Sequence, residues 1–506
     1  MNKILTQNEI QSTIENLRSK NNSLKIVQCH GVFDLVHPGH IEHFKKAKSN
    51  GDILIVTITA DKYINKGPNR PYFDQIRRAN FLEQLEIIDF VFIVESKSAV
   101  DAINLIAPDY YVKGSDYQNL KADITGKITE EKNAVEKHGG RLVFTDGFTS
   151  SSTMLINNEL FPQNTEIRAW VKDFKKTYTL ENVFHWIDKL GKISVNVLGE
   201  TIIDIYTECK PLAKSSKDPI LAFHKFETRK FLGGVLAIAD SCSNWSKDTT
   251  VHSICGNDLD QHIIESGQIL KFNSEITQLH DHKTIIKHRF VDINSGNRVF
   301  EYYDYSPEPF NTKLQELILE KLNNVLNSRS LIVLADYGHG LFGEIFIEQI
   351  SKALAFIAVN TQSNAGNRGF NTFSKYPRID FLSLNGAELE LELRKKNLDY
   401  FKVVPEIMEQ KKCKNTIVTL GGDGLITFDS DGDGVKTPAF ATKVVDKVGA
   451  GDSVLAIASM LSFVSAPKEI IGLLSSIVAA YEVAQLGHKN SVSKVELKKY
   501  VAGLLG

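Results

Sequence analysis

The chain has 506 residues, of which 42% are hydrophobic and 24% charged, and its formal net charge is −2. This length allows about two to four domains, and the balanced charge gives no overall basic field to attract nucleic acid or an anionic membrane. The five cysteines are scattered without a C-x-x-C pair, a pattern that supplies neither a disulfide framework nor a zinc site.

The N-terminal segment MNKILTQNEIQSTIENLRSKNN is polar and predicts a helix. It lacks the apolar core of a signal peptide. The apolar runs of the chain are far shorter than the roughly 18 residues of a membrane-spanning helix. We therefore expect a cytoplasmic protein.

Strand and helix patterns alternate from about residue 25 to residue 148. The runs IVQCHGVF, DILIVTITA, DFVFIVE, DYYVKG and RLVFTDGF predict strands, and HIEHFKKAKS, RRANFLEQLE and AVDAINLIA predict helices. Repeated β–α alternation is typical of an α/β fold with a parallel, doubly wound sheet. A polar, helical segment follows over 156–190.

A second β–α pattern begins at KISVNVLGETIIDIY and ends in VGAGDSVLAIASML and further helices. Within it, HKTIIKHRFVDINSGNRVFEYYD alternates like a hairpin with SGN at its turn, which fits either a lid over a site or an ordinary edge hairpin. The sequence thus predicts a first domain over 1–155, a helical linker over 156–190 and a second α/β domain over 191–506.

The stretch GVFDLVHPGH, residues 31–40, contains the end of one predicted strand and the start of the next helix, with proline in the first helical turn. Backbone N–H groups and the helix dipole favour an anion at such a start, and Gly31 and Gly39 permit close approach. His37 and His40 can hydrogen-bond a phosphate and stabilise charge that develops on it. The alternative is a loop with two solvated histidines.

This stretch resembles the G-x-F-D-x-x-H-x-G-H signature of cytidylyltransferase-like nucleotidyltransferases, a resemblance that covers roughly residues 25–155. KGPNRP with the following Arg78, YVKGSDY and TSSST resemble further segments of the sugar-phosphate adenylyltransferase branch. The resemblance implies a Rossmann-like domain in which a sugar phosphate attacks the α-phosphate of a nucleoside triphosphate. Pyrophosphate leaves without a covalent intermediate, and Mg²⁺ assists by bridging oxygens.

The residues implied are His37, His40 and Lys113 for catalysis, and Gly31, Phe33, Asp34, Gly39, Arg78, Ser151, Ser152 and Thr153 for nucleotide or phosphate binding. Each has a structural alternative when taken singly. Lys113 could belong to a turn, Arg78 could be a solvated helix residue, and 151–153 could be an ordinary N-cap.

The stretch VVDKVGAGDSVLA, residues 444–456, places Gly449, Ala450 and Gly451 before Asp452 and an apolar helix. Backbone N–H groups at this helix start would form a small anion hole. Asp452 is placed to take a proton from a hydroxyl. A glycine-rich helix start capped by the aspartate is the alternative.

This motif resembles the D-x-V-G-A-G-D motif of ribokinase-like, pfkB-type carbohydrate kinases, over about residues 192–506. LGETIIDIY, FLGGVLAIA, ADYGHG, NGAE and TLGGDG follow in the family's order. The resemblance implies transfer of the γ-phosphoryl group of ATP to a sugar hydroxyl, mostly by positioning and charge stabilisation.

The residues implied in this second domain are Asp452 as base; Gly449, Ala450, Gly451, Thr419, Gly421 and Gly424 at the nucleotide; Asp204, Gly233, Gly234, Asp336 and Asn360 at the substrate; and Asn385 and Glu388 for Mg²⁺. Three departures fall on substrate-facing positions. Ala237 stands where the family has an asparagine, His339 replaces a lysine, and VNTQSNAGNRG replaces a D-P-K-G-type stretch. They put the sugar in question and leave the phosphate chemistry in place.

Together the two halves resemble the bifunctional heptose 7-phosphate kinase/heptose 1-phosphate adenylyltransferase family, with the domain order reversed. This implies an enzyme that makes a nucleotide-activated sugar such as ADP-heptose for lipopolysaccharide or capsule, with Mg²⁺, ATP as phosphate donor, and ATP or CTP as nucleotidyl donor. The alternatives are a CTP-dependent route to a CDP-polyol, and a chain with one inactive domain that serves in binding or dimerisation. The expected partners are sugar or polyol phosphates, without nucleic acid or membrane, and a homodimer is compatible with the resemblance.

Overall fold

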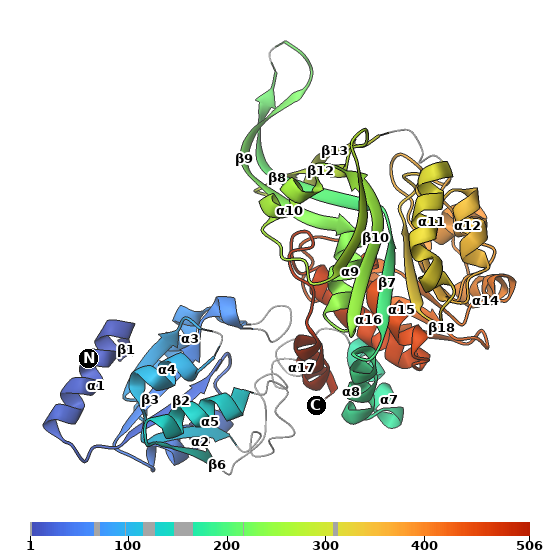
Figure 1. Ribbon diagram of the computed structural model, residues 1–506. Coiled ribbons are helices and arrows are strands. Elements are labelled where there is room, and N and C mark those ends of the chain that lie inside the picture. The colour runs from blue at the N-terminus through green and yellow to red at the C-terminus, as the bar shows by residue number, and fades with distance from the viewer. Residues whose placement is uncertain are drawn as a thin grey trace. The chain divides into compact units, whose positions relative to one another are not determined.

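The computed structural model describes residues 3–64, 71–96, 98–114, 127–145, 165–215, 217–306 and 312–505. The chain divides into two compact units, one of residues 1–165 with 498–506 and the other of residues 166–497. Each unit has its own sheet, with helices on its faces (Figure 1). No helix among the described residues combines the length and apolar character needed to span a membrane.

The first unit is built on a six-stranded sheet in the order β1-β4-β3-β2-β5-β6, and all its strand pairs are parallel. Its strands are β1 (Ile4–Leu5), β2 (Ile26–Gly31), β3 (Ile53–Thr59), β4 (Phe90–Val94), β5 (Tyr110–Gly114) and β6 (Arg141–Thr145). Its helices are α1 (Gln7–Lys20), α2 (Pro38–Lys48), η1 (Asp61–Tyr63), α3 (Gln75–Glu83), α4 (Val100–Ile106) and α5 (Lys127–Lys137). The central strands are apolar nearly throughout because helices cover both faces of such a sheet.

The strand order of this sheet reverses at β2, with β3 and β4 on one side and β5 and β6 on the other. In doubly wound sheets, ligands bind beyond the carboxyl ends of the strands at this reversal. Gly31 ends β2 and Gly114 ends β5 at that place. The doubly wound α/β fold predicted from the sequence is therefore confirmed.

One detail of the prediction differs from the structure. The sequence run IVQCHGVF predicts a strand through Phe33, whereas β2 ends at Gly31. Phe33 has a φ of 48°, which takes the chain out of the extended conformation.

The second unit is built on a nine-stranded sheet in the order β11-β10-β7-β14-β15-β16-β17-β18-β19, parallel except for the last two strands. Its strands are β7 (Ser194–Gly199), β10 (Asp248–Gly256), β11 (Asn273–Leu279), β14 (Leu331–Asp336), β15 (Phe356–Thr361), β16 (Phe381–Asn385), β17 (Asn415–Thr419), β18 (Leu425–Phe428) and β19 (Gly434–Thr437). Its helices are α7 (Thr165–Thr177), α8 (Leu180–Leu190), α9 (Val235–Ser243), α10 (Leu259–Ser266), α11 (Thr312–Leu326), α12 (Glu344–Ser351), η5 (Phe373–Lys375), α13 (Gly386–Leu393), α14 (Tyr400–Lys411), η6 (Gly421–Asp423), α15 (Ala450–Phe463) and α16 (Lys468–Glu482). α17 (Lys494–Leu505) spans the division between the two units.

A smaller four-stranded sheet belongs to the second unit, in the order β13-β12-β8-β9. Its strands are β8 (Thr201–Lys214), β9 (Leu221–Gly234), β12 (Ile285–Asp292) and β13 (Arg298–Asp304). β12 and β13 form the hairpin predicted from the sequence, and Gly296 supplies the positive φ, 70°, that its turn requires. The far end of the β8–β9 hairpin projects from the unit (Figure 1).

A large apolar core underlies the nine-stranded sheet, and Phe346 of α12 is fully buried in it. We predict that Phe346→Ala lowers the free energy of unfolding of the second unit by about 3–5 kcal/mol, because the removed ring leaves a cavity. Chemical denaturation followed by tryptophan fluorescence would measure this, since all three tryptophans, Trp170, Trp186 and Trp245, lie in that unit.

Phe370 is the matched control, because its side chain is 90% exposed. Phe370→Ala should change the same free energy by less than about 0.5 kcal/mol. Equal effects of the two substitutions would contradict the described core.

Candidate functional site

The loop between β2 and α2 carries the predicted nucleotide site of the first unit. Phe33 turns the chain with its positive φ, and its ring lies over Gly31, where an added Cβ would approach the ring to 3.0 Å. The same ring contacts the ring of His40 edge to face, with 5.3 Å between centroids. Gly31 and Phe33 therefore shape the loop that presents the histidines.

His37 and His40 cap α2 reciprocally. The N–H of Gly39 donates to His37 Nδ1 at 3.1 Å, and the N–H of His37 donates to His40 Nδ1 at 3.3 Å. Their ring centroids are 4.0 Å apart. Because each Nδ1 accepts a hydrogen bond, each neutral ring carries its proton on Nε2.

Burial lowers the pKa of His37, which favours this neutral form. His37 Nε2 is buried and has no hydrogen-bond partner among the described residues. The structure therefore brings the two histidines together as hydrogen-bond donors at a helix start, where an oxyanion is favoured.

Lys113 lies near the end of β5, beside β2 in the sheet. Its Nζ is 3.0 Å from Glu131 Oε2, and both side chains are buried. His43 of α2 contacts Thr145 Oγ1 through Nδ1 at 2.8 Å, and burial, followed by the charge of Lys113, lowers the pKa of His43 to about 4. The sequence motifs did not identify Glu131 or His43, although His43 follows His40 by one helical turn.

Asp34 and Arg78, both predicted to bind nucleotide, contact the protein itself. The carboxylate of Asp34 accepts the N–H groups of Tyr72, at 2.8 and 2.9 Å, and Phe73, at 2.9 Å. The buried guanidinium of Arg78 donates to the carbonyl of Val32 at 2.6 Å and forms further hydrogen bonds. These further acceptors are the carbonyls of Thr59 and Phe73 and the carboxylate of Asp61. In this conformation both residues hold the loops around the histidines.

Some predicted positions lie outside the described residues. They are Ser151, Ser152 and Thr153, most of KGPNRP (residues 66–71), and the end of YVKGSDY (residues 111–117). Their phosphate-binding role stays a prediction.

The predicted anion hole of the second unit begins α15. Gly449 is the N-cap with a φ of 83°, and Ala450, Gly451 and Asp452 form the first turn. The first N–H groups of a helix have no intrahelical acceptor and can bind an anion. An added Cβ at Gly449 would lie 3.0 Å from Glu482 Oε1, a tight contact, and the positive φ itself favours glycine.

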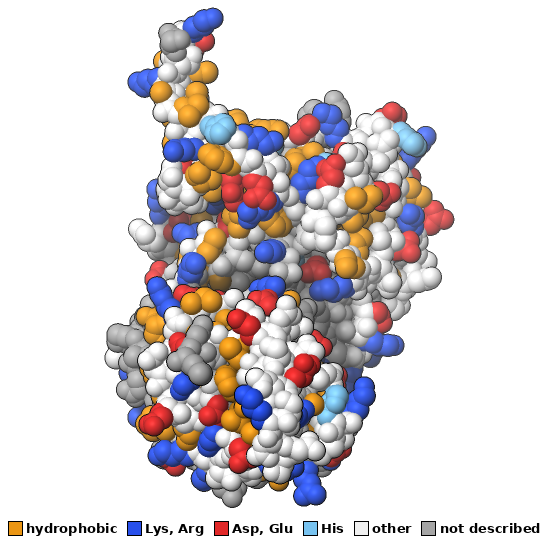
Figure 2. Space-filling model, turned by 90° about the vertical axis from the view of Figure 1, so that its left-hand side faces the viewer, with side chains coloured by type: hydrophobic (Ala, Val, Ile, Leu, Met, Phe, Trp, Pro, Cys, Tyr) orange, Lys and Arg blue, Asp and Glu red, His pale blue; other side chains and the backbone are white. Residues whose placement is uncertain are grey.

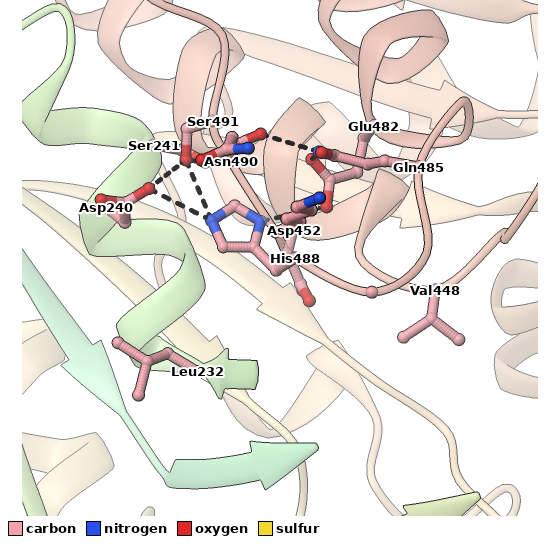
Figure 3. Close-up of polar contacts among 12 residues, drawn as sticks. Leu232, Asp240, Ser241, Val448, Asp452, Glu482, Gln485, His488, Asn490 and Ser491 are labelled. Atoms are coloured by element: carbon pink, nitrogen blue, oxygen red, sulfur yellow. Dashed lines mark hydrogen bonds and ion pairs between the residues drawn. The ribbon is translucent and has the colours of Figure 1, made fainter. Parts of the chain in front are cut away.

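A buried imidazole supports this turn (Figure 3). His488 Nδ1 is 3.0 Å from Glu482 Oε1, and His488 Nε2 is 3.4 Å from Asp240 Oδ2 and 2.9 Å from Ser491 Oγ. Burial disfavours the charged imidazole, but Glu482 and Asp240 outweigh it and raise the pKa of His488 to about 10. The sequence motifs did not include this ionic cluster, which joins α9 to α16.

Asp452, the predicted base, is partly buried and lies among hydrogen-bond donors. Its Oδ1 accepts from the hydroxyl of Tyr337 at 3.0 Å and from Nε2 of Gln362 at 2.6 Å. Burial raises the pKa of Asp452 to about 6, and the hydrogen bond from Tyr337 opposes this shift. Such a carboxylate is ionised at neutral pH and more basic than an exposed aspartate, as a general base requires.

Asp204 and the Gly233–Gly234 pair lie together in the four-stranded sheet. An added Cβ at Gly233 would collide with the carboxylate of Asp204, and Gly234 has a φ of 55°. Asp204 forms a buried ion pair with Arg289 of β12. The glycines therefore make room for Asp204, and Arg289 is a partner that the sequence motifs missed.

Asp336 and Asn360, predicted as substrate contacts, are both buried and bonded within the unit. Asp336 Oδ2 accepts from the hydroxyl of Tyr376 at 2.7 Å and lies 2.5 Å from Nζ of Lys375. Asn360 Nδ2 donates to the carbonyl of Ser383 at 2.8 Å. In this conformation they hold the ends of β14 and β15 in place.

The predicted Mg²⁺ residues form a capping box at α13. Asn385 Oδ1 accepts from the N–H of Glu388 at 2.8 Å, and Glu388 Oε2 accepts from the N–H of Asn385 at 3.0 Å. Burial raises the pKa of Glu388 to about 7. No cluster of three or more His, Cys, Asp or Glu side chains able to hold a metal occurs in the described ranges. Mg²⁺ commonly binds one or two side-chain oxygens and keeps water and substrate phosphate as its other ligands, so Asn385 and Glu388 are suited to it.

The turn TLGGDG connects β17 to β18. Thr419 ends β17, and Gly421 and Gly424 have φ values of 61° and 86°. An added Cβ at Gly424 would collide with the carbonyl of Thr437. The glycines of this motif are thus explained by backbone conformation, and contact with ATP stays a prediction.

Comparison with known proteins agrees with both halves. The model of cytidylyltransferase-like proteins matches residues 29–158, and the model of pfkB family carbohydrate kinases matches residues 192–491. The bifunctional protein HldE of Aliarcobacter butzleri is 37% identical over 146 residues, which are 28% of this chain and 29% of that protein. HldE of Geobacter metallireducens is 37% identical over 141 residues, 27% of each chain. The aligned part thus spans less than a third of these relatives.

The second unit is similar in fold to a solved enzyme. The crystal structure of phosphofructokinase-2 from Escherichia coli in complex with substrates and products covers 62% of this chain and 99% of its own, with a TM-score of 0.50 and 17% identity. A cytidylyltransferase-like domain is therefore followed by a carbohydrate kinase domain. The pfkB family model matches more than half of the residues of this chain. The chain therefore belongs to the pfkB family of carbohydrate kinases.

Proposed function

We propose that the chain is a bifunctional enzyme that phosphorylates a sugar or sugar phosphate and transfers a nucleotidyl group to a sugar phosphate. The observation that carries this proposal is the presence of two separate oxyanion sites at helix starts. One holds the paired donors His37 and His40, and the other holds the partly buried carboxylate Asp452. Because both reactions consume nucleoside triphosphates, the cytoplasmic location predicted from the sequence is part of the proposal.

The nucleotidyl transfer is an in-line displacement at phosphorus. An oxygen of the sugar phosphate forms a bond to the α-phosphorus while the bond to the pyrophosphate oxygen breaks. The Nε2–H groups of His37 and His40 donate to the oxygens on which negative charge grows. Lys113, positioned by Glu131, adds a positive charge beside them.

The phosphoryl transfer uses the second site. Asp452 accepts the proton of the sugar hydroxyl as its oxygen bonds to the γ-phosphorus, and ADP leaves. The N–H groups at the start of α15 bind the transferred group. Mg²⁺, held by phosphate oxygens and by water near Asn385 and Glu388, would neutralise phosphate charge.

The substrate and the nucleotide are finer parts of the proposal. The similarity to HldE and the sequence motifs favour a heptose phosphate and a product such as ADP-heptose for a surface polysaccharide. A CTP-dependent route to a CDP-polyol is the second candidate, because Ala237, His339 and the 359–369 segment depart from the heptose kinase pattern. A chain with one inactive domain is the third.

We predict that His40→Ala abolishes pyrophosphate release and leaves phosphorylation intact, and that Asp452→Asn does the reverse. Each substitution removes one reacting group from one unit and should lower its reaction by about 100-fold or more. Phosphorus NMR with Mg²⁺ would follow heptose 7-phosphate with ATP, and heptose 1-phosphate with ATP or with CTP.

The unaffected reaction of each variant is the control for folding. If His40→Ala transfers nucleotide at the wild-type rate, the site in the first unit is wrong. If neither heptose phosphate reacts with the wild-type protein, the sugar assignment fails, and a screen of other sugars and polyols tests the chemistry itself.

The pH dependence of phosphorylation tests the role of Asp452. We predict that kcat/KM falls with an apparent pKa near 6 as the pH is lowered, because protonated Asp452 cannot accept the hydroxyl proton. Tyr337→Phe removes a donor to the carboxylate, so the pKa should rise by about one unit. A pH–rate profile of each protein measures this.

Tyr376→Phe is the matched control, because its equally buried hydroxyl donates to Asp336 instead. It should leave the pKa that governs kcat/KM unchanged. A profile of Tyr337→Phe identical to that of the wild-type protein would remove Asp452 from the role of base.

We also propose a homodimer formed through the four-stranded sheet. β9 and β13 are its edges, and exposed apolar side chains, among them Leu212, Leu221, Phe226 and Phe300, lie on its hairpins. Figure 2 shows such side chains on the projecting hairpin. Edge strands and apolar patches favour pairing with another chain.

Analytical ultracentrifugation tests the dimer. The wild-type protein should sediment as a dimer that Phe226→Glu weakens, whereas a wild-type monomer at micromolar concentration would contradict the proposal.

A further inference from the structure

Lys287 of β12 is a mostly buried residue of the second unit, and no carboxylate of the described residues neutralises its charge at contact distance. The residue is 7% exposed. Among the described residues, no carboxylate oxygen lies within 4.0 Å of its Nζ, and no hydrogen bond from it is observed. Two aromatic rings lie beside the amine instead, with the centroid of Tyr337 at 5.3 Å and that of Tyr303 at 5.4 Å.

Such an amine is costly to bury, because water solvates an ammonium group far better than aromatic faces do. Burial accordingly lowers the pKa of Lys287, and the nearby carboxylates Asp204, Asp452 and Glu200 act against this shift. An ammonium group that has lost most of its contact with water and has no ionic partner in the described residues is suited to bind an anion.

Lys287 lies near both the predicted sugar contact, Asp204, and the predicted base, Asp452. It lies opposite Asp204 in the parallel pairing of β12 with β8. The ring of Tyr337 lies between it and the base, because the hydroxyl of that ring donates to Asp452. Lys287 therefore lies beside both the predicted sugar contact and the predicted base.

The other polar groups near this place are neutral or already paired. Arg289 is bound to Asp204 and lies 3.6 Å from Glu301. His339, where the kinase pattern has a lysine, is kept neutral because burial, followed by the charge of Lys287, lowers its pKa to about 4. His339 Nε2 is buried without a partner in the described part of the chain. His339 thus has an unsatisfied nitrogen, and the charge of Lys287 acts on its ring.

We propose that Lys287, together with His339, binds a phosphoryl group in the kinase site. A phosphoryl oxygen would supply the anion that the amine lacks and an acceptor for the imidazole. The group belongs either to the γ-position of ATP or to the acceptor sugar, and both have the same chemistry. The inference rests on the kinase half of the proposed function.

Nucleotide binding to the full chain tests whether Lys287 contacts the γ-phosphoryl group of ATP. Hydrogen–deuterium exchange of the segment 446–456 reports binding at the second unit alone. Titrations with Mg²⁺ would compare ADP with a β,γ-methylene analogue of ATP, for the wild-type protein, Lys287→Met and Lys287→Arg. Acceptor KM for a sugar phosphate and for its unphosphorylated sugar tests the second source.

Lys283→Met is the matched control, because Lys283 precedes β12, is largely exposed and pairs with Asp304 at 2.9 Å. It should change none of these values by more than about twofold. Tryptophan fluorescence on heating checks that each variant is folded.

Two results support the proposal. If Lys287→Met lowers the affinity for the ATP analogue by about tenfold or more and leaves the affinity for ADP unchanged, the amine contacts the γ-phosphoryl group. If both nucleotides bind as before and the KM of the phosphorylated acceptor alone rises by about tenfold, the amine contacts the acceptor. Lys287→Arg should keep most of the affinity in either case, because it keeps the charge.

Other results overturn it. Unchanged nucleotide affinity and unchanged KM in Lys287→Met would exclude a phosphoryl contact. Equal losses in Lys287→Met and Lys287→Arg would show that the shape of the side chain matters and its charge does not. If the wild-type protein shows neither protection of 446–456 by ADP nor any phosphorylation, the proposed kinase function itself fails, and the role of Lys287 fails with it.

Discussion

The kinase half of the molecule depends on the ionic cluster of His488 with Glu482 and Asp240. The imidazole is positively charged at neutral pH, since its two carboxylate partners outweigh the cost of burial. It ties α9, which follows the Gly233–Gly234 pair, to the end of α16. Glu482 in turn lies against Gly449, so the first turn of α15 and its Asp452 rest on this cluster. Removing one partner would leave an unpaired buried charge, which is strongly destabilising.

In the proposed function, both units bind phosphoryl oxygens, and their candidate sites are built in related ways. Each presents the N–H groups of a helix start at the carboxyl end of a parallel sheet. The first unit adds the rings of His37 and His40, whose Nδ1 atoms accept backbone N–H groups so that Nε2 is the nitrogen left to donate. The second unit adds a carboxylate whose basicity is set by burial and by Tyr337 and Gln362. Neutral donors suit transition-state stabilisation, whereas a basic carboxylate suits removal of a hydroxyl proton.

Much of the fold could be predicted from the sequence, which also supplied the residues from which both candidate sites are built. The β–α alternation and the two glycine-rich motifs depend on local spacing, which a single sequence displays directly. Glu131, His488 and Lys287 belong to none of these motifs. Asp240, one partner of His488, is 248 residues away, and Asp204, opposite Lys287, lies on another strand, so only the folded chain brings them close. Asp34 and Arg78 show the reverse case. They match a motif, yet the structure occupies their polar groups with backbone partners.

The four-stranded sheet separates two properties of the kinase half. It carries Asp204, Arg289 and Lys287, whereas Asp452 belongs to α15 outside it. In the proposed function, the groups that contact the acceptor are thus on one element, and the group that removes its proton is on another. Substitutions in this sheet would then change the accepted sugar while Asp452 and the start of α15 keep their geometry.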